Sequence, residues 1–299
     1  MQKHPQLQAE QTGASASINF PASAGPILKW PGGKMRLLPT LRKLLPAGNR
    51  LIEPFLGGAS VFLGTDFPSY LLLDAHVDLI GMYKQMVARP ERIIELARPL
   101  FSKYAANEAI YSDVRDAFNR AAPADVRAAY FLYLNKFGFN GLSRYSAKGN
   151  FNVPWGRSAQ APTLPEESIR AFSERVRNKA VIVQGDFVDA FKLAVPGDVI
   201  YCDPPYVDLD DAPSFTKYTA EGFPRERQQE LADLARITAA RGIPVLISNH
   251  LTMETRELYR GSECHEVEVR RSVAAQAGSR KLVDEGIFVF EAYDEAVSR

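Results

Sequence analysis

The segment Asp203-Pro204-Pro205-Tyr206 combines residue types that suit one kind of chemistry. It directly follows the apolar run 198–202, which the pattern predicts to be a buried strand. Ligands of open α/β sheets bind outside the carboxyl ends of such strands. Proline fixes φ and donates no N–H, so the carbonyls here are rigid and available as acceptors. With the Asp203 carboxylate, they can accept the hydrogens of a planar amine and stabilise the positive charge that builds on its nitrogen during methyl transfer.

Tyr206 adds a flat ring that can stack on a base turned out of a duplex. The alternative is a strand end followed by a Pro-rich turn. The tyrosine and the buried strand together favour the chemical interpretation. We therefore predict a catalytic role for Asp203, Pro204, Pro205 and Tyr206.

Cys202 precedes Asp203 inside the apolar run, whereas the nucleophilic cysteine of cytosine-C5 methyltransferases follows a proline. We interpret it as a buried structural thiol. The sequence has 2 cysteines and 4 scattered histidines, a pattern that predicts neither a disulfide framework nor a metal site and fits a reducing cytoplasm. The expected reaction is a direct transfer without metal or covalent intermediate.

A second motif, residues 53–60, runs from a predicted strand into a glycine turn and a short helix. Glycines such as Gly57 let the backbone approach a ligand closely, and Phe55 precedes them. Asp74 ends the next predicted strand, where an acid can accept hydrogen bonds from ribose hydroxyls. Asp74 could also be a helix N-cap, and the two roles are compatible.

The segment 29–34 places an indole, two glycines and two lysines before the first predicted strand. Trp30 could pack on the methionine end of a sulfonium cofactor, and Lys34 could reach its carboxylate. The simpler interpretation of this segment alone is a surface turn.

The loop 135–157 interleaves aromatic rings with Asn and Arg side chains. Arg pairs bidentately with guanine and Asn with adenine in the major groove, and an exposed aromatic can wedge into a base stack. We expect Phe151 and Trp155 to be core residues, but not Phe139, which Gly138 and Asn140 flank.

The net charge of +1 conceals a strong segregation of charge. The stretches 20–52, 126–165 and 269–283 carry Lys and Arg but no acid, which favours a polyanionic partner. No segment approaches the ~20 apolar residues of a membrane span, and none reads as a signal peptide. We expect a monomer that does not bind membranes.

Continuous apolar runs predict buried strands of a parallel sheet at 50–54, 70–74, 180–184, 198–202 and 243–248, and 264–272 with 286–292 predict an antiparallel pair. Helical periodicity fits 35–45, 76–88, 225–241 and much of 90–136. The strand–helix alternation breaks between about 90 and 165. We predict a disordered tail (1–24), a catalytic domain (25–76 and 166–299) and an inserted target-recognition domain (77–165).

At these motifs the chain resembles the bacterial DNA adenine methylase (Dam) family, over about residues 28–285. The order of motifs is that of the α group of amino-methyltransferases: cofactor, recognition, then catalysis. The motifs that carry the resemblance are 29–34, 53–58, 131–135, 139–145, 151–154, 201–206, 247–250 and 270–272.

The resemblance implies an α/β fold, a Rossmann-like class I S-adenosylmethionine-dependent methyltransferase with a mostly helical inserted DNA-recognition domain. It implies S-adenosylmethionine as methyl donor and adenine N6 in GATC of double-stranded DNA as target. Phe139 stands where family members often carry Tyr, and Ser158 where they often carry an aromatic residue. By motif match the cofactor and catalytic pocket would contain Trp30, Lys34, Phe55, Gly57, Asp74 and Asp203, and DNA would be contacted by Phe139 as the inserting ring and by Asn140, Leu142, Arg144, Pro154 and Arg157.

Other functions fit parts of the pattern. An amino-methyltransferase acting on another DNA sequence, cytosine N4, RNA or protein amides shares the catalytic motif, but the recognition loop favours duplex DNA. A dinucleotide-dependent oxidoreductase would need a full GxGxxG after its first strand, which is absent here. A catalytically silent DNA-binding protein would not need residues 203–206. The motifs leave open whether the role is replication, repair, phage defence or restriction–modification.

Overall fold

The computed structural model describes residues 26–102, 106–157, 160–206, 223–270 and 282–292. Within them a seven-stranded sheet has the order β3-β2-β1-β4-β5-β7-β6. The first five strands in sequence are parallel, and β7 pairs antiparallel with both β5 and β6. The strands are β1 (Arg50–Glu53), β2 (Ser69–Asp74), β3 (Ala180–Gln184), β4 (Asp198–Cys202), β5 (Val245–His250), β6 (Glu263–Arg270) and β7 (Leu282–Phe290).

The sheet follows from the continuous apolar runs of the sequence. In β4 and β5 almost every residue is buried, because helices cover both faces of these central strands. The outermost strand β3 is only partly covered, and Val181 in it is 61% exposed. The five predicted parallel strands and the antiparallel closing pair are confirmed, with β7 beginning four residues earlier than expected, at Leu282 rather than at residue 286.

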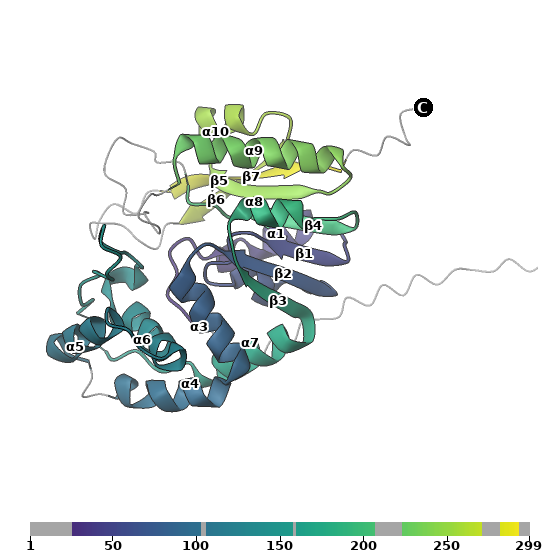
Figure 1. Ribbon diagram of the computed structural model, residues 1–299. Helices are drawn as coiled ribbons and strands as arrows, with labels where there is room; N and C mark the ends of the chain where they lie inside the picture. The colour runs from purple at the N-terminus through teal and green to yellow at the C-terminus, as the bar shows by residue number, and fades with distance from the viewer. Residues whose placement is uncertain (1–25, 103–105, 158–159, 207–222, 271–281, 293–299) are drawn as a thin grey trace, which may run out of the picture.

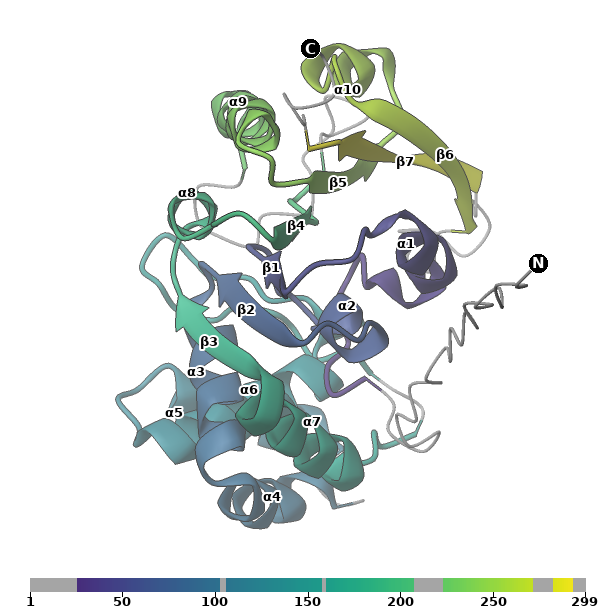
Figure 2. The same cartoon turned by 90° about the vertical axis from the view of Figure 1, so that its right-hand side faces the viewer.

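Helices cover the two faces of the sheet (Figure 2), with α8 (Phe187–Lys192) and α9 (Arg225–Ala240) on one side and α1 (Leu38–Leu44) and α2 (Ser60–Gly64) on the other. Adjacent strand residues serve opposite faces because side chains alternate along a strand. Leu51 thus belongs to one buried cluster, and Ile52 to the other.

The segment between β2 and β3 is helical, as predicted for much of 90–136, and lies at one end of the molecule (Figure 1). Its helices share the buried core of the sheet face that α1 and α2 cover. The loop 138–156 follows and leads toward α7. The helices of this segment are α3 (Val77–Ala88), α4 (Pro90–Ala97), α5 (Glu108–Phe118), α6 (Ala124–Phe137) and α7 (Glu166–Lys179), with 3-10 turns at Arg98–Phe101 and Phe139–Gly141. Another 3-10 turn, Lys34–Arg36, precedes α1.

A last short helix, α10 (Met253–Leu258), follows β5 and begins with a capping box on Thr252. Among the described helices, none has both the length and the apolar character that a membrane span requires. The predicted disordered tail lies outside the described residues.

Candidate active site and nucleic-acid interface

Three acids lie at the carboxyl ends of β1, β2 and β4. These strand ends form one edge of the sheet. Glu53 ends β1, Asp74 ends β2 and Asp203 follows β4. Residue register places them together, since Ile52 of β1 lies beside both Leu71 and Ile200. This is the edge where open α/β sheets bind ligands.

Asp203 is held by a buried cation from the start of the chain. Lys34 Nζ lies 2.8 Å from Asp203 Oδ1 and donates to the Gly32 carbonyl at 2.7 Å. The same ammonium lies 4.8 Å from the centroid of the Tyr206 ring. The motif 29–34 thus joins the catalytic segment, although sequence analysis placed Lys34 at the cofactor carboxylate.

The charge state of Asp203 is set by opposing effects. Burial raises its pKa to about 6, while the Lys34 ammonium and the Tyr206 hydroxyl act to lower the pKa and Glu285 raises it. The carboxylate therefore ionises within one pH unit of neutrality, and its affinity for hydrogen-bond donors changes in that range.

Tyr206 is fixed at both its hydroxyl and its ring. Its hydroxyl donates to Glu285 Oε2 at 2.9 Å, and its ring meets His250 edge-on with centroids 4.7 Å apart. The Pro205 carbonyl accepts from Gln228 Nε2 at 2.7 Å. Sequence analysis missed Glu285 and Gln228, because β7 and α9 approach this segment only in the folded chain.

Glu53 is the most deeply buried acid of the edge, with 2% of its surface exposed. Burial and the nearby Asp203 charge raise its pKa to about 8. Among the described residues, nothing hydrogen-bonds its Oε1 atom. The sequence showed Glu53 only as the first residue of the glycine motif and assigned it no role.

The glycine turn after β1 and the segment 29–34 pack directly on each other. Gly57 has φ +47°, and a Cβ built there would lie 2.7 Å from Trp30 Nε1. The turn thus needs a residue without a side chain because the indole of Trp30 lies on it.

Asp74 organises this turn through both carboxylate oxygens. Oδ2 accepts from the Gly57 N–H and Oδ1 from the His76 N–H, each at 2.9 Å. The N-cap of α3 is His76, whose Nδ1 accepts from Leu79 N, so the interpretation of Asp74 as the cap is wrong.

An aromatic cluster borders the same edge. Phe55 stacks on Phe187 with centroids 5.5 Å apart and meets Phe223 edge-on at 5.6 Å. Asp186 precedes Phe187, caps α8 and forms an ion pair with Arg227. Sequence analysis missed Asp186 and Phe187, although Gly185-Asp186-Phe187 directly after a strand was an available signal.

The recognition loop forms two antiparallel arms. Isolated bridges pair Gly138 with Trp155 and Tyr145 with Phe151, and Phe139 N donates to the Pro154 carbonyl at 2.9 Å. As expected, Phe151 is buried and Phe139 is 46% exposed. Trp155 was expected in the core, but it is half-buried and packs against the core from outside.

The residues assigned to DNA lie together on this structure and mostly face outward. Asn140 and Arg157 adopt left-handed backbone conformations, with φ of +53° and +48°. Leu142 is half-buried, and the others are exposed: Phe139, Asn140, Arg144, Pro154 and Arg157. Ser158 lies outside the described residues.

Arg144 is held by Asn152 of the opposite arm. Its Nε donates to Asn152 Oδ1 at 2.7 Å, and its Nη2 donates to the Asn152 carbonyl at 3.1 Å. No carboxylate of the described residues lies within ion-pair distance of Arg144. Tyr145 instead donates its hydroxyl to Asp78 at 2.6 Å. The guanidinium thus keeps part of its donor capacity for a partner.

Comparison with known proteins shows the family of this chain. The model of the D12 class N6 adenine-specific DNA methyltransferase family matches residues 30–273. This chain belongs to that family. It is 42% identical over 264 residues to the DNA adenine methylase of Escherichia coli K12, covering 88% of this chain and 94% of that protein.

Two further relatives have similar coverage. A DNA adenine methylase of Vibrio cholerae is 42% identical over 264 residues, which cover 88% of this chain and 95% of the relative. The retron Ec67 DNA adenine methylase of Escherichia coli is 40% identical over 265 residues, with 88% and 90% covered. The predicted family, the Rossmann-like fold and the adenine-specific DNA methyltransferase activity are thereby confirmed.

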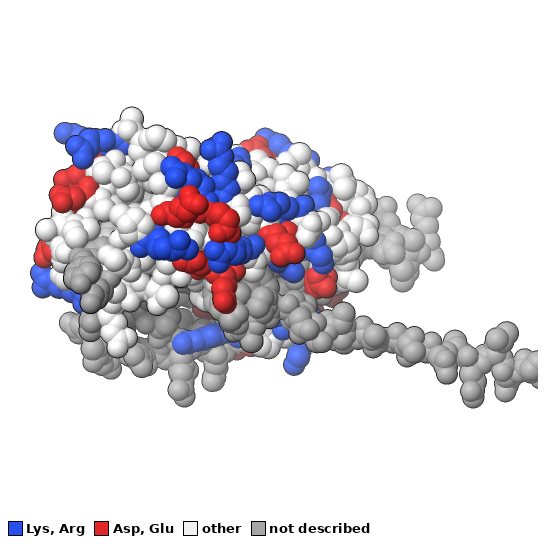
Figure 3. All heavy atoms as spheres, turned by 90° about the horizontal axis from the view of Figure 1, so that it is seen from below, with Lys and Arg blue, Asp and Glu red and all other residues white. Residues whose placement is uncertain are grey.

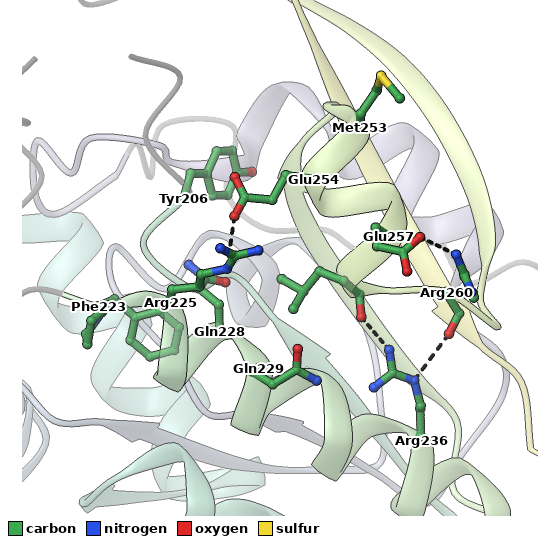
Figure 4. Close-up of a pocket in the computed structure, with 12 residues that line it drawn as sticks. Tyr206, Phe223, Arg225, Gln228, Gln229, Arg236, Met253, Glu254, Glu257 and Arg260 are labelled. Carbon is green, nitrogen blue, oxygen red and sulfur yellow. Dashed lines mark hydrogen bonds and ion pairs between the residues drawn. The ribbon is translucent and has the colours of Figure 1, made fainter. Parts of the chain in front are cut away.

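A pocket of about 1010 Å³ extends from Tyr206 of this methyltransferase between α9 and α10 (Figure 4). Its cations are paired within the pocket: Arg225 with Glu254 at 3.4 Å, and Arg260 with Glu257. Arg236 donates to carbonyls of the α10 end. Paired charges of both signs do not favour the binding of a phosphate in this pocket.

The face formed by α4 and α7 carries interleaved charges (Figure 3). Arg170 pairs with Glu91 at 2.7 Å and with Glu166 at 3.4 Å, and Arg98 also pairs with Glu166. The methyltransferase therefore presents a mixed surface there. Among the residues that the structure describes, no group of three His, Cys, Asp or Glu side chains is arranged to hold a metal.

Proposed function

We propose that this methyltransferase transfers a methyl group from S-adenosylmethionine to N6 of adenine in GATC sites of duplex DNA. One observation carries the proposal: Asp203 and Tyr206, held by Lys34 and Glu285, lie at the strand edge that also carries Asp74. We propose that the methyl donor's nucleoside binds at Asp74 and that the adenine amine binds beside it, at Asp203 and Tyr206.

The residues at the edge fit the methyl donor. The half-buried Asp74 can accept from ribose hydroxyls, and the Gly57 turn offers a close backbone approach beside the Trp30 indole. Phe55 supplies an aromatic surface, and Lys34 supplies a cation. When bound, S-adenosylmethionine supplies an electrophilic methyl group on a sulfonium.

The amine is activated by acceptors rather than by a base. Asp203 and the Pro204 carbonyl accept the two hydrogens of N6, so positive charge on that nitrogen is stabilised as its bond to methyl forms and the bond from methyl to sulfur breaks. Sulfur leaves as a neutral thioether, and N6 afterwards loses one proton to solvent. The Tyr206 ring stacks on the turned-out adenine. Lys34 keeps Asp203 oriented, and neither a metal nor a covalent intermediate takes part.

Sequence is read by the inserted region 77–165, which we propose as the target-recognition domain, with residues 25–76 and 166–299 as the catalytic domain. Phe139 inserts into the base stack, and Asn140, Leu142 and Arg144 lie in the major groove with Pro154. Arg157 contacts the DNA at the loop end. We further propose that the protein acts as a monomer in the cytoplasm.

The test is expression in a host free of DNA methylation, followed by genome-wide mapping of modified bases. We expect N6-methyladenine in GATC and nowhere else, and none with Asp203→Ala expressed in parallel. Methyl groups found only on cytosine or only on RNA would refute the proposed reaction, and N6-methyladenine in another sequence would refute the proposed target.

A further inference from the structure

The buried His76 side chain connects the recognition loop to the carboxyl end of β2, where Asp74 lies. It is 7% exposed and lies at the N-terminus of α3, two residues after Asp74. Its Nε2 lies 2.7 Å from the hydroxyl oxygen of Ser143, 67 residues away in sequence. Ser143 is 4% exposed and immediately precedes Arg144.

The hydrogen bonds fix which nitrogen of the ring carries the proton. Nδ1 accepts the backbone N–H of Leu79 at 3.1 Å, so it carries none. The proton of the neutral ring is then on Nε2, which donates to the Ser143 hydroxyl oxygen. Burial lowers the pKa of His76, which favours this neutral form.

The ring is oriented by its surroundings. It lies 5.5 Å from the Phe131 ring, 5.6 Å from Tyr145 and 6.0 Å from Trp30, measured between centroids. Two residues further along the chain, Asp78 accepts the Tyr145 hydroxyl at 2.6 Å. The first turn of α3 thus holds the loop on both sides of Arg144.

We infer that His76 is a positioning residue for sequence recognition: its Nε2–H holds Ser143 so that the adjacent Arg144 is directed at its base. The inference rests on the proposed function, in which Arg144 reads a base. An anchor directly before Arg144 limits how far its backbone can move, and discrimination by a bidentate contact depends on that geometry. His76 itself touches neither DNA nor the methyl group.

Two substitutions break the contact from opposite sides. His76→Asn keeps a side-chain acceptor for Leu79 N, since Asn is a good N-cap, but is too short to reach Ser143. Ser143→Ala removes the acceptor and leaves the ring in place. The control is Val245→Ala, a truncation of a fully buried residue of β5 in the buried cluster that does not include the loop residues Phe151 and Val153.

The measurement is kcat/KM on GATC and on each single-substitution site, with Tm for every variant. Arg144→Ala identifies the base pair that Arg144 reads. At that pair we expect both His76→Asn and Ser143→Ala to reduce discrimination about tenfold. The double variant should show no further loss, and His76→Asn should have no added effect on an Arg144→Ala background. Val245→Ala should lower Tm and leave discrimination unchanged.

The outcomes separate the inference from the function on which it rests. A wild-type protein that does not discriminate between sites refutes the proposed function. If the wild type discriminates and Arg144→Ala relaxes one base pair, but His76→Asn and Ser143→Ala retain full discrimination there, His76 is only a helix cap and the inference is overturned.

Discussion

The pairing of Lys34 with Asp203 makes a prediction about pH at the scale of single residues. Asp203 must be ionised to accept the amine hydrogens, and its pKa is raised to about 6 by burial. kcat/KM should therefore be constant above that pH and fall about tenfold per unit below it. Because the Lys34 ammonium lowers this pKa, Lys34→Gln should move the acid limb to higher pH. If the acid limb of the pH–rate profile lies at the same pH in Lys34→Gln as in the wild type, the group that titrates is not Asp203.

Removing the Asp203 carboxylate tests its role directly. Asp203→Ala should reduce kcat about 10³-fold, because an acceptor at the reacting nitrogen is lost, while DNA affinity changes little. Asp203→Asn serves beside it, since alanine leaves the buried Lys34 unpaired. Cys202 is fully buried in β4, so Cys202→Ser is the control and should keep substantial activity. Near-normal turnover in Asp203→Ala would remove this residue from the mechanism.

Arg144 tests base reading against phosphate binding. A guanidinium on a guanine edge contributes ~1–3 kcal/mol of discrimination. Arg144→Ala should therefore narrow the rate gap between GATC and one class of substituted site, with non-specific binding little changed. If Arg144→Ala instead lowers kcat/KM by the same factor on every sequence, and the slope of log binding constant against log salt concentration falls by ~1 in magnitude, Arg144 contacts a phosphate.

At the scale of elements, Gly141 fixes how the recognition loop sits on the N-terminal segment. Gly141 has φ +67°, and a Cβ there would lie 2.4 Å from Lys29 Cβ and 2.6 Å from its carbonyl oxygen. Gly141→Ala should displace the loop and weaken specific DNA binding. The matched control is Gly149→Ala, which has φ +76° but no atom within 4 Å, so it carries only the ~1–2 kcal/mol of backbone strain. Equal effects on Tm and on DNA binding in both variants would contradict a packing role.

The same scale shows what the sequence could predict about the elements. The strands were predictable because a parallel sheet buried on both faces demands continuous apolar runs, and 198–202 is one of them. The helix α7 was not predicted because it is highly charged. Only three large apolar residues are buried in it, Ile169, Phe172 and Val176. The short helices α8 and α10 carry too few turns to show a period.

The candidate site was predictable in its residue types and less so in its contacts. Asp203, Tyr206 and Asp74 stand out because each follows a recognisable strand. Their partners come from distant parts of the chain: Lys34 lies far upstream of Asp203, and Glu285 reaches Tyr206 from β7. Such contacts arise because the topology brings separate strand ends to one edge of the sheet. Local sequence patterns therefore do not predict them.

At the scale of the whole molecule, the buried Glu53 and the half-buried Asp203 make stability depend on pH. The pKa of Glu53 is raised to about 8 and that of Asp203 to about 6, so the folded state holds protons that the unfolded chain has released. This stability is fully present below the unfolded pKa values, near 4, and is lost as pH rises through the folded values. Both acids contribute to the loss up to about pH 6, and Glu53 dominates from there to about pH 8.

Glu53→Gln isolates the second part of that loss. The amide cannot ionise, so the wild type should lose stability relative to the variant between pH 6 and pH 8, by up to ~1.4 kcal/mol per pH unit, and the difference should level off above pH 8. Denaturant unfolding of both proteins at pH 5 to 9 measures it. Glu226→Gln, at an exposed position in the first turn of α9, is the control and should give a constant difference. If the stability difference between wild type and Glu53→Gln is also constant with pH, Glu53 is already ionised in the folded protein. The site then contains two neighbouring negative charges, on Glu53 and Asp203.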